Sequence, residues 1–153
     1  MASQKIATFL WFDHQAEEAA KFYSSLFPDS RIINIVPGPT GAALVVEFSL
    51  AGVVYLAMNG GPHFKFNEAI SLAVNCEDQA EVDRLWSQLT DGGSPGRCGW
   101  LKDRYGLSWQ IVPVLMPRLM KDPDPVKVGR MMAAMMTMTK LDSNVLQAAF
   151  DGQ

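Results

Sequence analysis

The sequence is short of cysteine, histidine and charged residues. Its 153 residues include two cysteines, Cys76 and Cys98, and two histidines. Two cysteines that form no CxxC pair are too few for a disulfide scaffold, so we expect buried, reduced thiols. Charged residues make up 19% of the chain and hydrophobic residues 48%. This composition excludes an intrinsically disordered protein and predicts a packed core.

Long apolar runs and an excess of basic residues are also missing. No stretch approaches the length needed to cross a bilayer, and the first residues lack the apolar segment of a secretory signal. The net charge is −3, so the chain lacks the excess of positive charge that attracts nucleic acid or an anionic membrane. We therefore expect a cytoplasmic protein that binds neither nucleic acid nor membrane.

The chain does contain one pattern of strands and helices that occurs twice. The elements expected in the first half are a strand at 5–12, a helix at 15–27 that begins after Asp13 as its cap, and strands at 31–36, 42–50 and 52–58. The elements expected in the second half are a strand at 69–74, a helix that ends at Gly92, and strands at 98–102 and 108–113.

The openings of the two expected helices also match in sequence. Asp13-His14-Gln15-Ala16-Glu17 opens the first, and Glu77-Asp78-Gln79-Ala80-Glu81 opens the second. The match and its context predict a duplicated βαβββ unit of about 60 residues. Each unit would expose one apolar sheet face, so we expect the two to pair as curved sheets around a shared cleft. The predicted fold is a single α+β domain over 1–153, with modules at 4–58 and 68–113.

The residues after 113 predict a C-terminal helical extension over 115–152. Pro125 suits the first position of a helix and Asp124 its cap, while Asp142 or Ser143 would cap a last short helix. The first of these helices carries a stripe of methionines, which adapt to irregular surfaces. This stripe would pack on the body of the domain, form a dimer contact or contact a ligand.

Several segments resemble one superfamily. They are Phe9-Leu10-Trp11-Phe12, Asn59-Gly60-Gly61-Pro62, Cys98-Gly99-Trp100-Leu101-Lys102-Asp103 and Tyr105-Gly106-Leu107-Ser108-Trp109-Gln110. With the doubled βαβββ pattern, the chain resembles the vicinal oxygen chelate superfamily, which includes glyoxalase I, extradiol dioxygenases and bleomycin-resistance proteins. It is most similar to the PhnB-like branch, often called demethylubiquinone methyltransferase-like. The resemblance implies the fold, but superfamily members perform unrelated chemistry.

The resemblance also implies where a metal would bind in such an enzyme. The corresponding positions are Ala7 and Ala69 in the first strand of each half, and Leu56 and Gln110 in the last strand. Divalent metals need several converging nitrogen and oxygen ligands, and Gln110 alone offers a lone pair. His14 and His63 are expected on the surface. We therefore expect no metal and no other cofactor.

Strand alternation identifies a candidate ligand site in the expected cleft. Its residues are Phe9, Trp11, Glu47, Ser71, Trp100 and Gln110. Glu47 interrupts an apolar run, so it is either a base in the cleft or an ordinary surface residue of its strand. The lining suits a hydrophobic or aromatic small molecule, unless Phe9 and Trp11 simply fill the space.

These observations lead to one functional hypothesis and two alternatives. The hypothesis is a metal-independent small-molecule-binding protein of unassigned activity. The first alternative is an enzyme, either a methyltransferase or a metal-dependent lyase or dioxygenase; the glycine-rich strand-to-helix turn of S-adenosylmethionine enzymes is missing. The second is an interaction module that forms a homodimer. The sequence leaves open the ligand, the reaction, and whether the modules pair within one chain or between two.

Overall fold

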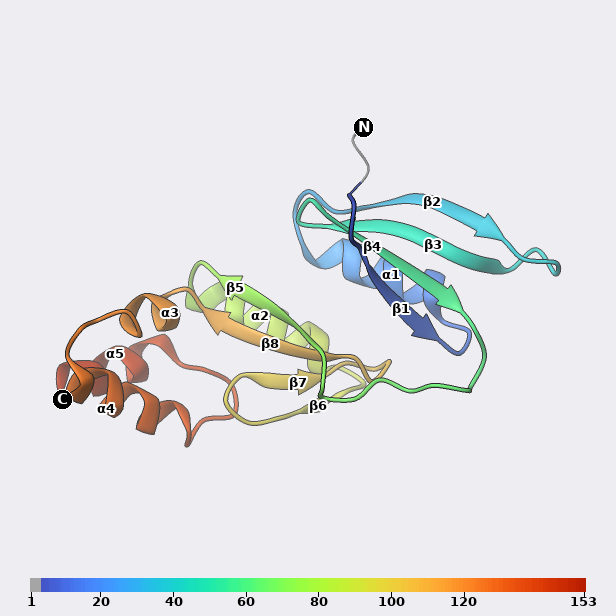
Figure 1. Cartoon of the computed structure of the whole chain (residues 1–153). Helices are drawn as coiled ribbons and strands as arrows, with labels where there is room; N and C mark the ends of the chain where they lie inside the picture. Colours follow the sequence, from blue (N-terminus) through green and yellow to red (C-terminus); the bar gives the residue numbers. More distant parts are fainter. Residues whose placement is uncertain (1–3) are drawn as a thin grey trace. The chain divides into compact units, whose positions relative to one another are not determined.

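The computed structural model describes residues 4–153 and has α+β architecture (Figure 1). The chain divides into two compact units, one that ends at Phe66 and one from Asn67 to Gln153. Each unit contains one four-stranded sheet, and the second unit also carries the C-terminal helices. Among the described residues, none of the helices has the length and apolar character needed to span a bilayer.

The first unit contains five elements. They are β1 (Thr8–Phe12), α1 (Ala16–Leu26), β2 (Arg31–Pro37), β3 (Ala43–Leu50) and β4 (Val53–Asn59). The strand order in the sheet is β1-β4-β3-β2, and β1 is parallel to β4 while the other neighbours are antiparallel. The strands and the helix expected from the sequence are confirmed here to within a few residues.

The second unit repeats this topology. Its elements are β5 (Ser71–Cys76), α2 (Gln79–Thr90), β6 (Ser94–Pro95), β7 (Trp100–Lys102) and β8 (Ser108–Pro113). The strand order is β5-β8-β7-β6, with β5 parallel to β8. The shared order confirms the duplicated βαβββ unit. The first strand begins at Ser71, later than expected, and the two-residue β6 was not predicted.

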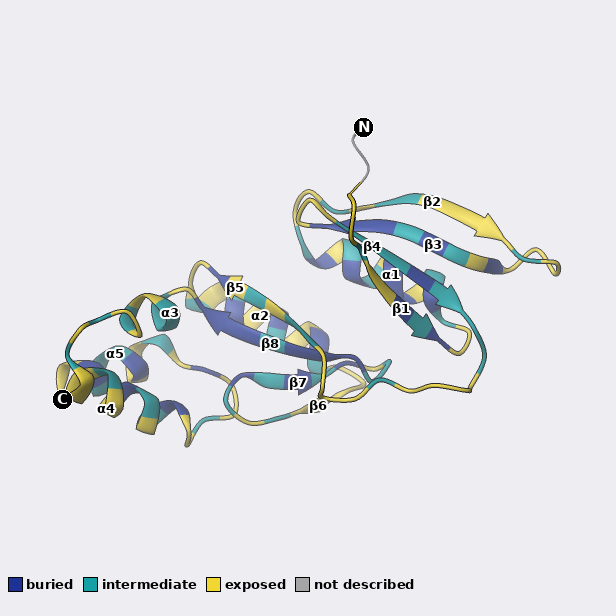
Figure 2. Cartoon of the chain, in the orientation of Figure 1, coloured by how far each residue is buried: buried dark blue, intermediate teal, exposed yellow. Residues whose placement is uncertain are grey.

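The core of the first unit lies between α1 and one face of the sheet. Ala19, Ala20 and Tyr23 are fully buried on the helix. Val46 and Phe48 are fully buried on β3, and the rings of Tyr23 and Phe48 are 6.5 Å apart. The exposed residues of the helix lie on its other side, as Figure 2 shows. This amphipathic pattern gives the helix a single packing face, so one sheet face is covered.

The predicted cap of α1 is wrong. Asp13 does not cap the helix, and the N-cap residue Gln15 makes no side-chain capping bond. Instead, the side chain of Asn59 at the end of β4 accepts a hydrogen bond from the Ala16 amide at 2.8 Å and donates one to the Ala43 carbonyl at 2.9 Å. A side chain at the end of β4 therefore satisfies a backbone amide in the first turn of this helix.

The second core lies between α2 and its sheet. Apolar spacing predicts one helix face with Val82, Leu85, Trp86 and Leu89. Val82, Leu85 and Leu89 are fully buried, and Trp86 is half-buried. Trp109 and Ile111 of β8 are buried against them at 1% and 0% exposure. α2 begins at its cap Asp78, whose side chain accepts a hydrogen bond from an amide of the first turn.

A buried carboxylate fixes the turn between β7 and β8. Asp103 is 3% exposed. One of its oxygens accepts hydrogen bonds from the amides of Tyr105 and Leu107, and the other accepts one from the indole nitrogen of Trp109 at 2.9 Å. The carboxylate thus holds the hairpin and orients a core tryptophan at once.

The C-terminal extension forms α3 (Leu115–Leu119), α4 (Pro125–Met135) and α5 (Ser143–Asp151). Asp124 and Asp142 cap the last two helices, which confirms the predicted starts. The buried residues of this part form one cluster, namely Val112, Met131, Met135, Leu141, Leu146 and Phe150. Met131 and Met135 of the methionine stripe therefore pack beside Val112 at the end of β8, whereas Met136 is 58% exposed.

Two sets of polar contacts anchor this extension. Gln79 at the start of α2 donates to the carbonyl of Leu141 at 2.9 Å and accepts from the amide of Ser143 at 2.8 Å. The amides of Cys98 and Gly99 donate to the carbonyls of Met138 and Thr139. The second set lies directly before β7, so the extension is joined to the segment that enters this strand.

Candidate functional site

In each unit, one sheet face is turned away from the covering helix, and we call it the distal face. In the first unit it carries Phe9, Trp11, Val45, Glu47, Leu56 and Met58; in the second it carries Ser71, Ala73, Trp100, Lys102, Ser108 and Gln110. The assignment follows from strand alternation. Glu47, for example, lies between Val46 and Phe48, which are both buried towards α1.

The candidate residues of the first unit lie in two neighbouring rows of its distal face. Phe9 pairs with Leu56, which in turn pairs with Glu47. Trp11 pairs with Met58 in the next row. Phe9 is 51% exposed and Glu47 is half-buried. Glu47 therefore lies on the distal face, beside the aromatic residue of β1.

The candidate residues of the second unit are arranged in the same way. Ala73 pairs with Gln110, which pairs with Trp100. Ser71 lies in the adjacent row, where its hydroxyl accepts a hydrogen bond from Nε2 of Gln110 at 2.9 Å. The structure therefore groups three of the six candidate residues in each unit, all on the distal faces.

The matching registers define equivalent positions in the two sheets. Phe9 corresponds to Ala73, Leu56 to Gln110, and Glu47 to Trp100. The counterpart of Ala7 is then Ser71, which lies two residues before Ala73, and not Ala69 as expected. The two rows thus have the same geometry but different chemistry.

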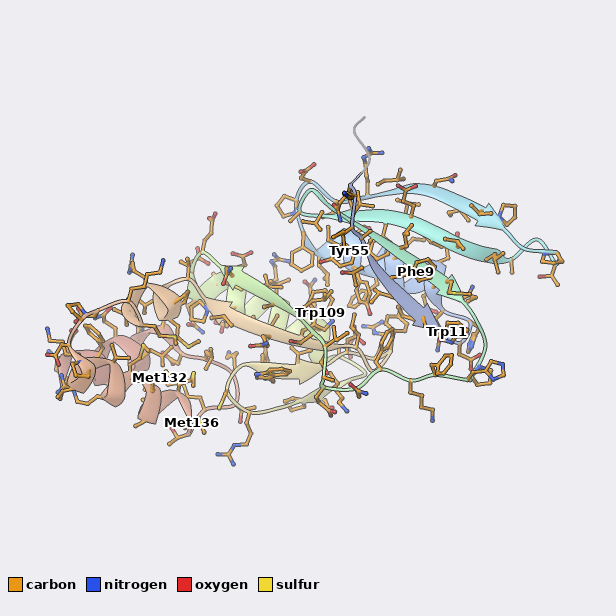
Figure 3. The ribbon with its side chains drawn as sticks, viewed as in Figure 1. Phe9, Trp11, Tyr55, Trp109, Met132 and Met136 are labelled. Carbon is orange, nitrogen blue, oxygen red and sulfur yellow. The ribbon has the colours of Figure 1, made fainter. Side chains whose placement is uncertain are left out.

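Trp11 is held by the loop after β4. Its indole nitrogen donates to the carbonyl of Gly61 at 2.9 Å, and its ring meets that of Phe64 edge to face, with 5.0 Å between centroids. A β-carbon on Gly60 would overlap the indole. Figure 3 shows Trp11 on the strand next to this loop. Much of its surface is therefore used in local packing, while Phe9 remains exposed.

The second unit contains a pocket of about 300 Å³ on its distal side. Its lining residues are Glu68, Ser94, Pro95, Gly96, Trp100, Leu101, Lys102 and Ser108. Trp100 is the one candidate residue from the sequence that lines it. Glu68, Lys102 and the β6 segment were not predicted from the sequence to form part of a site. The alternation that selected Trp100 could have indicated Lys102, two residues further along β7.

The pocket contains one ion pair and one unsatisfied hydroxyl. The ammonium of Lys102 pairs with the carboxylate of Glu68. The hydrogen bond from Lys102 is the main reason that the pKa of Glu68 lies below its usual value. Ser108 is 1% exposed, and its hydroxyl has no hydrogen-bond partner. Buried polar groups usually have partners, so this hydroxyl has unused hydrogen-bonding capacity beside the pocket.

The side chains at the expected metal positions do not fit a divalent ion. Leu56 offers no donor atom, and Gln110 offers an amide that already contacts Ser71. Ser71, which the register makes the counterpart of Ala7 in the repeat instead of Ala69, adds only a neutral hydroxyl. Within residues 4–153, no group of three or more His, Cys, Asp or Glu side chains is placed to hold a metal ion. Such sites normally combine imidazoles, thiolates or carboxylates.

The histidines and cysteines lie outside these rows. His14 and His63 are exposed, as predicted. Cys76 is buried and reduced, whereas Cys98 is only half-buried and its sulfur is 3.9 Å from that of Met136. The expectation of two buried thiols is therefore correct for Cys76 alone.

Residues 4–112 match a family model described as 3-demethylubiquinone-9 3-methyltransferase. A solved PhnB protein from Bacillus cereus is 34% identical, with a TM-score of 0.68 over 72% of this chain and 99% of its own. Protein PA1353 from Pseudomonas aeruginosa is 20% identical, with a TM-score of 0.58 over 70% of this chain and 95% of its own.

A fosfomycin resistance protein, FosX from Mesorhizobium loti, is similar in fold. It is 15% identical, with a TM-score of 0.56 over 79% of this chain and 100% of its own. No curated protein matches the chain. The family match ends at residue 112, so α3, α4 and α5 lie beyond it.

Proposed function

The chain belongs to the 3-demethylubiquinone-9 3-methyltransferase family, also called PhnB, and within this family we propose that it is a metal-independent protein that binds a hydrophobic or aromatic small molecule. The candidate ligand-contacting residues are those of the distal faces, namely Phe9, Trp11, Glu47, Ser71, Trp100 and Gln110. The specific reaction, if one follows binding, is not part of this proposal.

The pocket of the second unit is the observation that carries the proposal. Its volume of about 300 Å³ suits a small ligand, and Trp100 supplies an aromatic wall. The unsatisfied hydroxyl of Ser108 adds a polar contact of the kind that orients a ligand. None of these groups needs a metal to bind an organic molecule.

The test is a binding experiment on the full chain after treatment with EDTA. We expect benzamide and benzyl alcohol to cause saturable NMR shifts at the amides of Trp100, Lys102 and Ser108. Trp100→Leu should weaken these shifts, and Trp86→Leu, on α2, is the matched control. Binding that returns only when a divalent metal is added would refute metal independence, and no saturable shift at millimolar ligand would refute the binding function.

A methyltransferase is the second candidate, and the activity named for the family favours it. The loop from Gly60 onward leads to β5 without an intervening helix. It therefore lacks the strand-to-helix setting in which a glycine-rich turn usually binds S-adenosylmethionine. Titration calorimetry with S-adenosylmethionine separates the candidates. A saturable heat with one site per chain would favour the enzyme over the binding protein.

We also propose that the two modules form one domain, within one chain or across a homodimer. The support is the exposed apolar surface of the first distal face, where Phe9 is 51% exposed. Apolar sheet faces of this kind require a cover. Light scattering on the purified chain tests the homodimer, which a monomeric mass at micromolar concentration would exclude.

A further inference from the structure

We propose that the pocket of the second unit recognises an aromatic carboxylate, and that Lys102 exchanges its contact with Glu68 for one with the ligand. The inference rests on the proposed binding function and specifies the class of ligand. Its basis is the placement of one cation, one unsatisfied hydroxyl and one tryptophan around a single small cavity.

Lys102 is the group that would bind the anion. It is the one cationic residue among those lining the pocket, and Glu68 is the one anionic residue. The side chains of this pair are 40% and 63% exposed. Exposed ion pairs contribute little to stability, so a ligand carboxylate can displace Glu68 without disrupting the fold. Glu68 precedes β5 in a loop, and its carboxylate already shows how such a group approaches the ammonium.

Ser108 supplies the second contact. It pairs directly with Lys102 across β7 and β8, so the two side chains leave the same face of the sheet. The β-carbons of directly opposed residues are about 4.5–5.5 Å apart, a separation that one carboxylate can bridge with its two oxygens. The unpartnered Ser108 hydroxyl would donate to one oxygen, while Lys102 pairs with the other.

Trp100 defines the rest of the ligand. It lies two residues before Lys102 on β7 and therefore on the same face. A flat ring attached to the carboxylate would lie against the indole of Trp100, where aromatic pairs are favourable. A volume of about 300 Å³ lies at the lower end of the range for ligand pockets, so the ligand has one or two rings.

The experiment compares benzoate with benzamide, which has nearly the same shape but no charge. Both are titrated into the full chain at low salt, with affinity taken from NMR shifts at Trp100 and Ser108. We expect benzoate to bind about tenfold more tightly than benzamide, because a charge-assisted contact replaces a neutral one. The preference should decrease as salt is added.

Three variants assign this preference to named groups. Lys102→Met should remove the preference, and Lys102→Arg should retain it, since the charge is kept. Glu68→Gln should tighten benzoate several-fold, because the competing carboxylate is gone. Lys21→Met is the matched control: Lys21 also forms an exposed ion pair, with Glu17 at 2.8 Å, but on α1. It should change neither affinity.

The possible failures are distinguishable. Equal affinities for benzoate and benzamide, or a preference that survives Lys102→Met, would overturn the inference and leave the proposed binding function intact. Failure of both compounds to shift the pocket amides would overturn both. If Lys102→Met does not fold by circular dichroism, the retained preference of Lys102→Arg and the tighter benzoate binding of Glu68→Gln decide the question. A Glu68→Gln variant that binds benzoate no better than wild type counts against the inference.

Discussion

The backbone of Gly60 lies against the indole ring of Trp11, with no room for a β-carbon between them. This contact joins the loop after β4 to the strand at the edge of the first sheet. The hydrogen bond from the same indole to the Gly61 carbonyl fixes the ring in place. The loop and the tryptophan therefore depend on each other.

Gly60→Ala should destabilise the protein by about 1–3 kcal/mol, because the added methyl group forces the indole or the loop to move. The free energy of unfolding in urea measures this effect. Gly129→Ala is the control, since a β-carbon at that position on α4 meets nothing within 4 Å. The control should stabilise the chain by about 0.5–1 kcal/mol, the usual difference between alanine and glycine in a helix. Equal values for the two variants would contradict the packing of Gly60.

Asp103→Asn should cost about 1–3 kcal/mol, because an amide cannot accept hydrogen bonds on both of its terminal atoms. Its NH₂ group would face either the indole N–H of Trp109 or the backbone amides of the turn. Urea unfolding gives the loss of stability, and near-ultraviolet circular dichroism reports the environment of Trp109. Asp91→Asn, whose side chain is 81% exposed, should change stability by less than about 0.5 kcal/mol. A wild-type spectrum for Asp103→Asn would argue against the orienting role.

Gln79→Ala should loosen the C-terminal extension by removing both hydrogen bonds to Leu141 and Ser143. We expect faster hydrogen exchange at the Ser143 amide and faster tryptic cleavage after Lys140. The global free energy of unfolding should fall by about 1–2 kcal/mol. Gln88→Ala, on an exposed position of the same helix, is the control. Unchanged protection of Ser143 would show that the apolar cluster alone holds the extension.

Cys76 should make the stability fall at alkaline pH. Burial, with a smaller effect from Glu81, raises the pKa of this thiol from 9.0 to about 12. Below pH 9 the thiol is protonated in both states and contributes no pH dependence. Between pH 9 and 12 the unfolded chain loses the proton that the folded chain keeps, so the unfolded state binds fewer protons and stability decreases as pH rises.

Urea unfolding of wild type and Cys76→Ala between pH 7 and 10.5 tests this linkage. The variant is less stable at neutral pH because of the cavity, but its stability should fall less steeply above pH 9. Parallel curves for wild type and Cys76→Ala would mean that this thiol does not titrate differently in the two states.

The sequence predicts the repeated topology because its signals are local. Apolar spacing identifies the buried face of α2, although Trp86 on that face is only half-buried. Period-two alternation places Gln110 and Trp100 on one face of the sheet. The cap of α1 is mispredicted because the group that satisfies Ala16 comes from Asn59, far along the chain. No local pattern near Asp13 carries that information.

The pocket is less predictable for the same reason. Glu68 and Lys102 belong to segments far apart in the sequence. They come together because β5, which follows Glu68, and β7, which carries Lys102, both pair with β8. The two-residue β6 has no apolar alternation that would identify it as a strand. The sequence therefore indicates which residues share a face, while the long-range pairing decides which of them enclose a cavity.

The position of β1 beside β4 determines when the first sheet can form during synthesis. Because its first and last strands are direct neighbours, β1 remains without a partner on the ribosome until residues up to Asn59 have emerged. The second sheet repeats this delay, with β5 waiting for β8. Translation thus completes one sheet before the other begins, which keeps the unpaired strands of the two similar modules apart in time and reduces incorrect pairing between them.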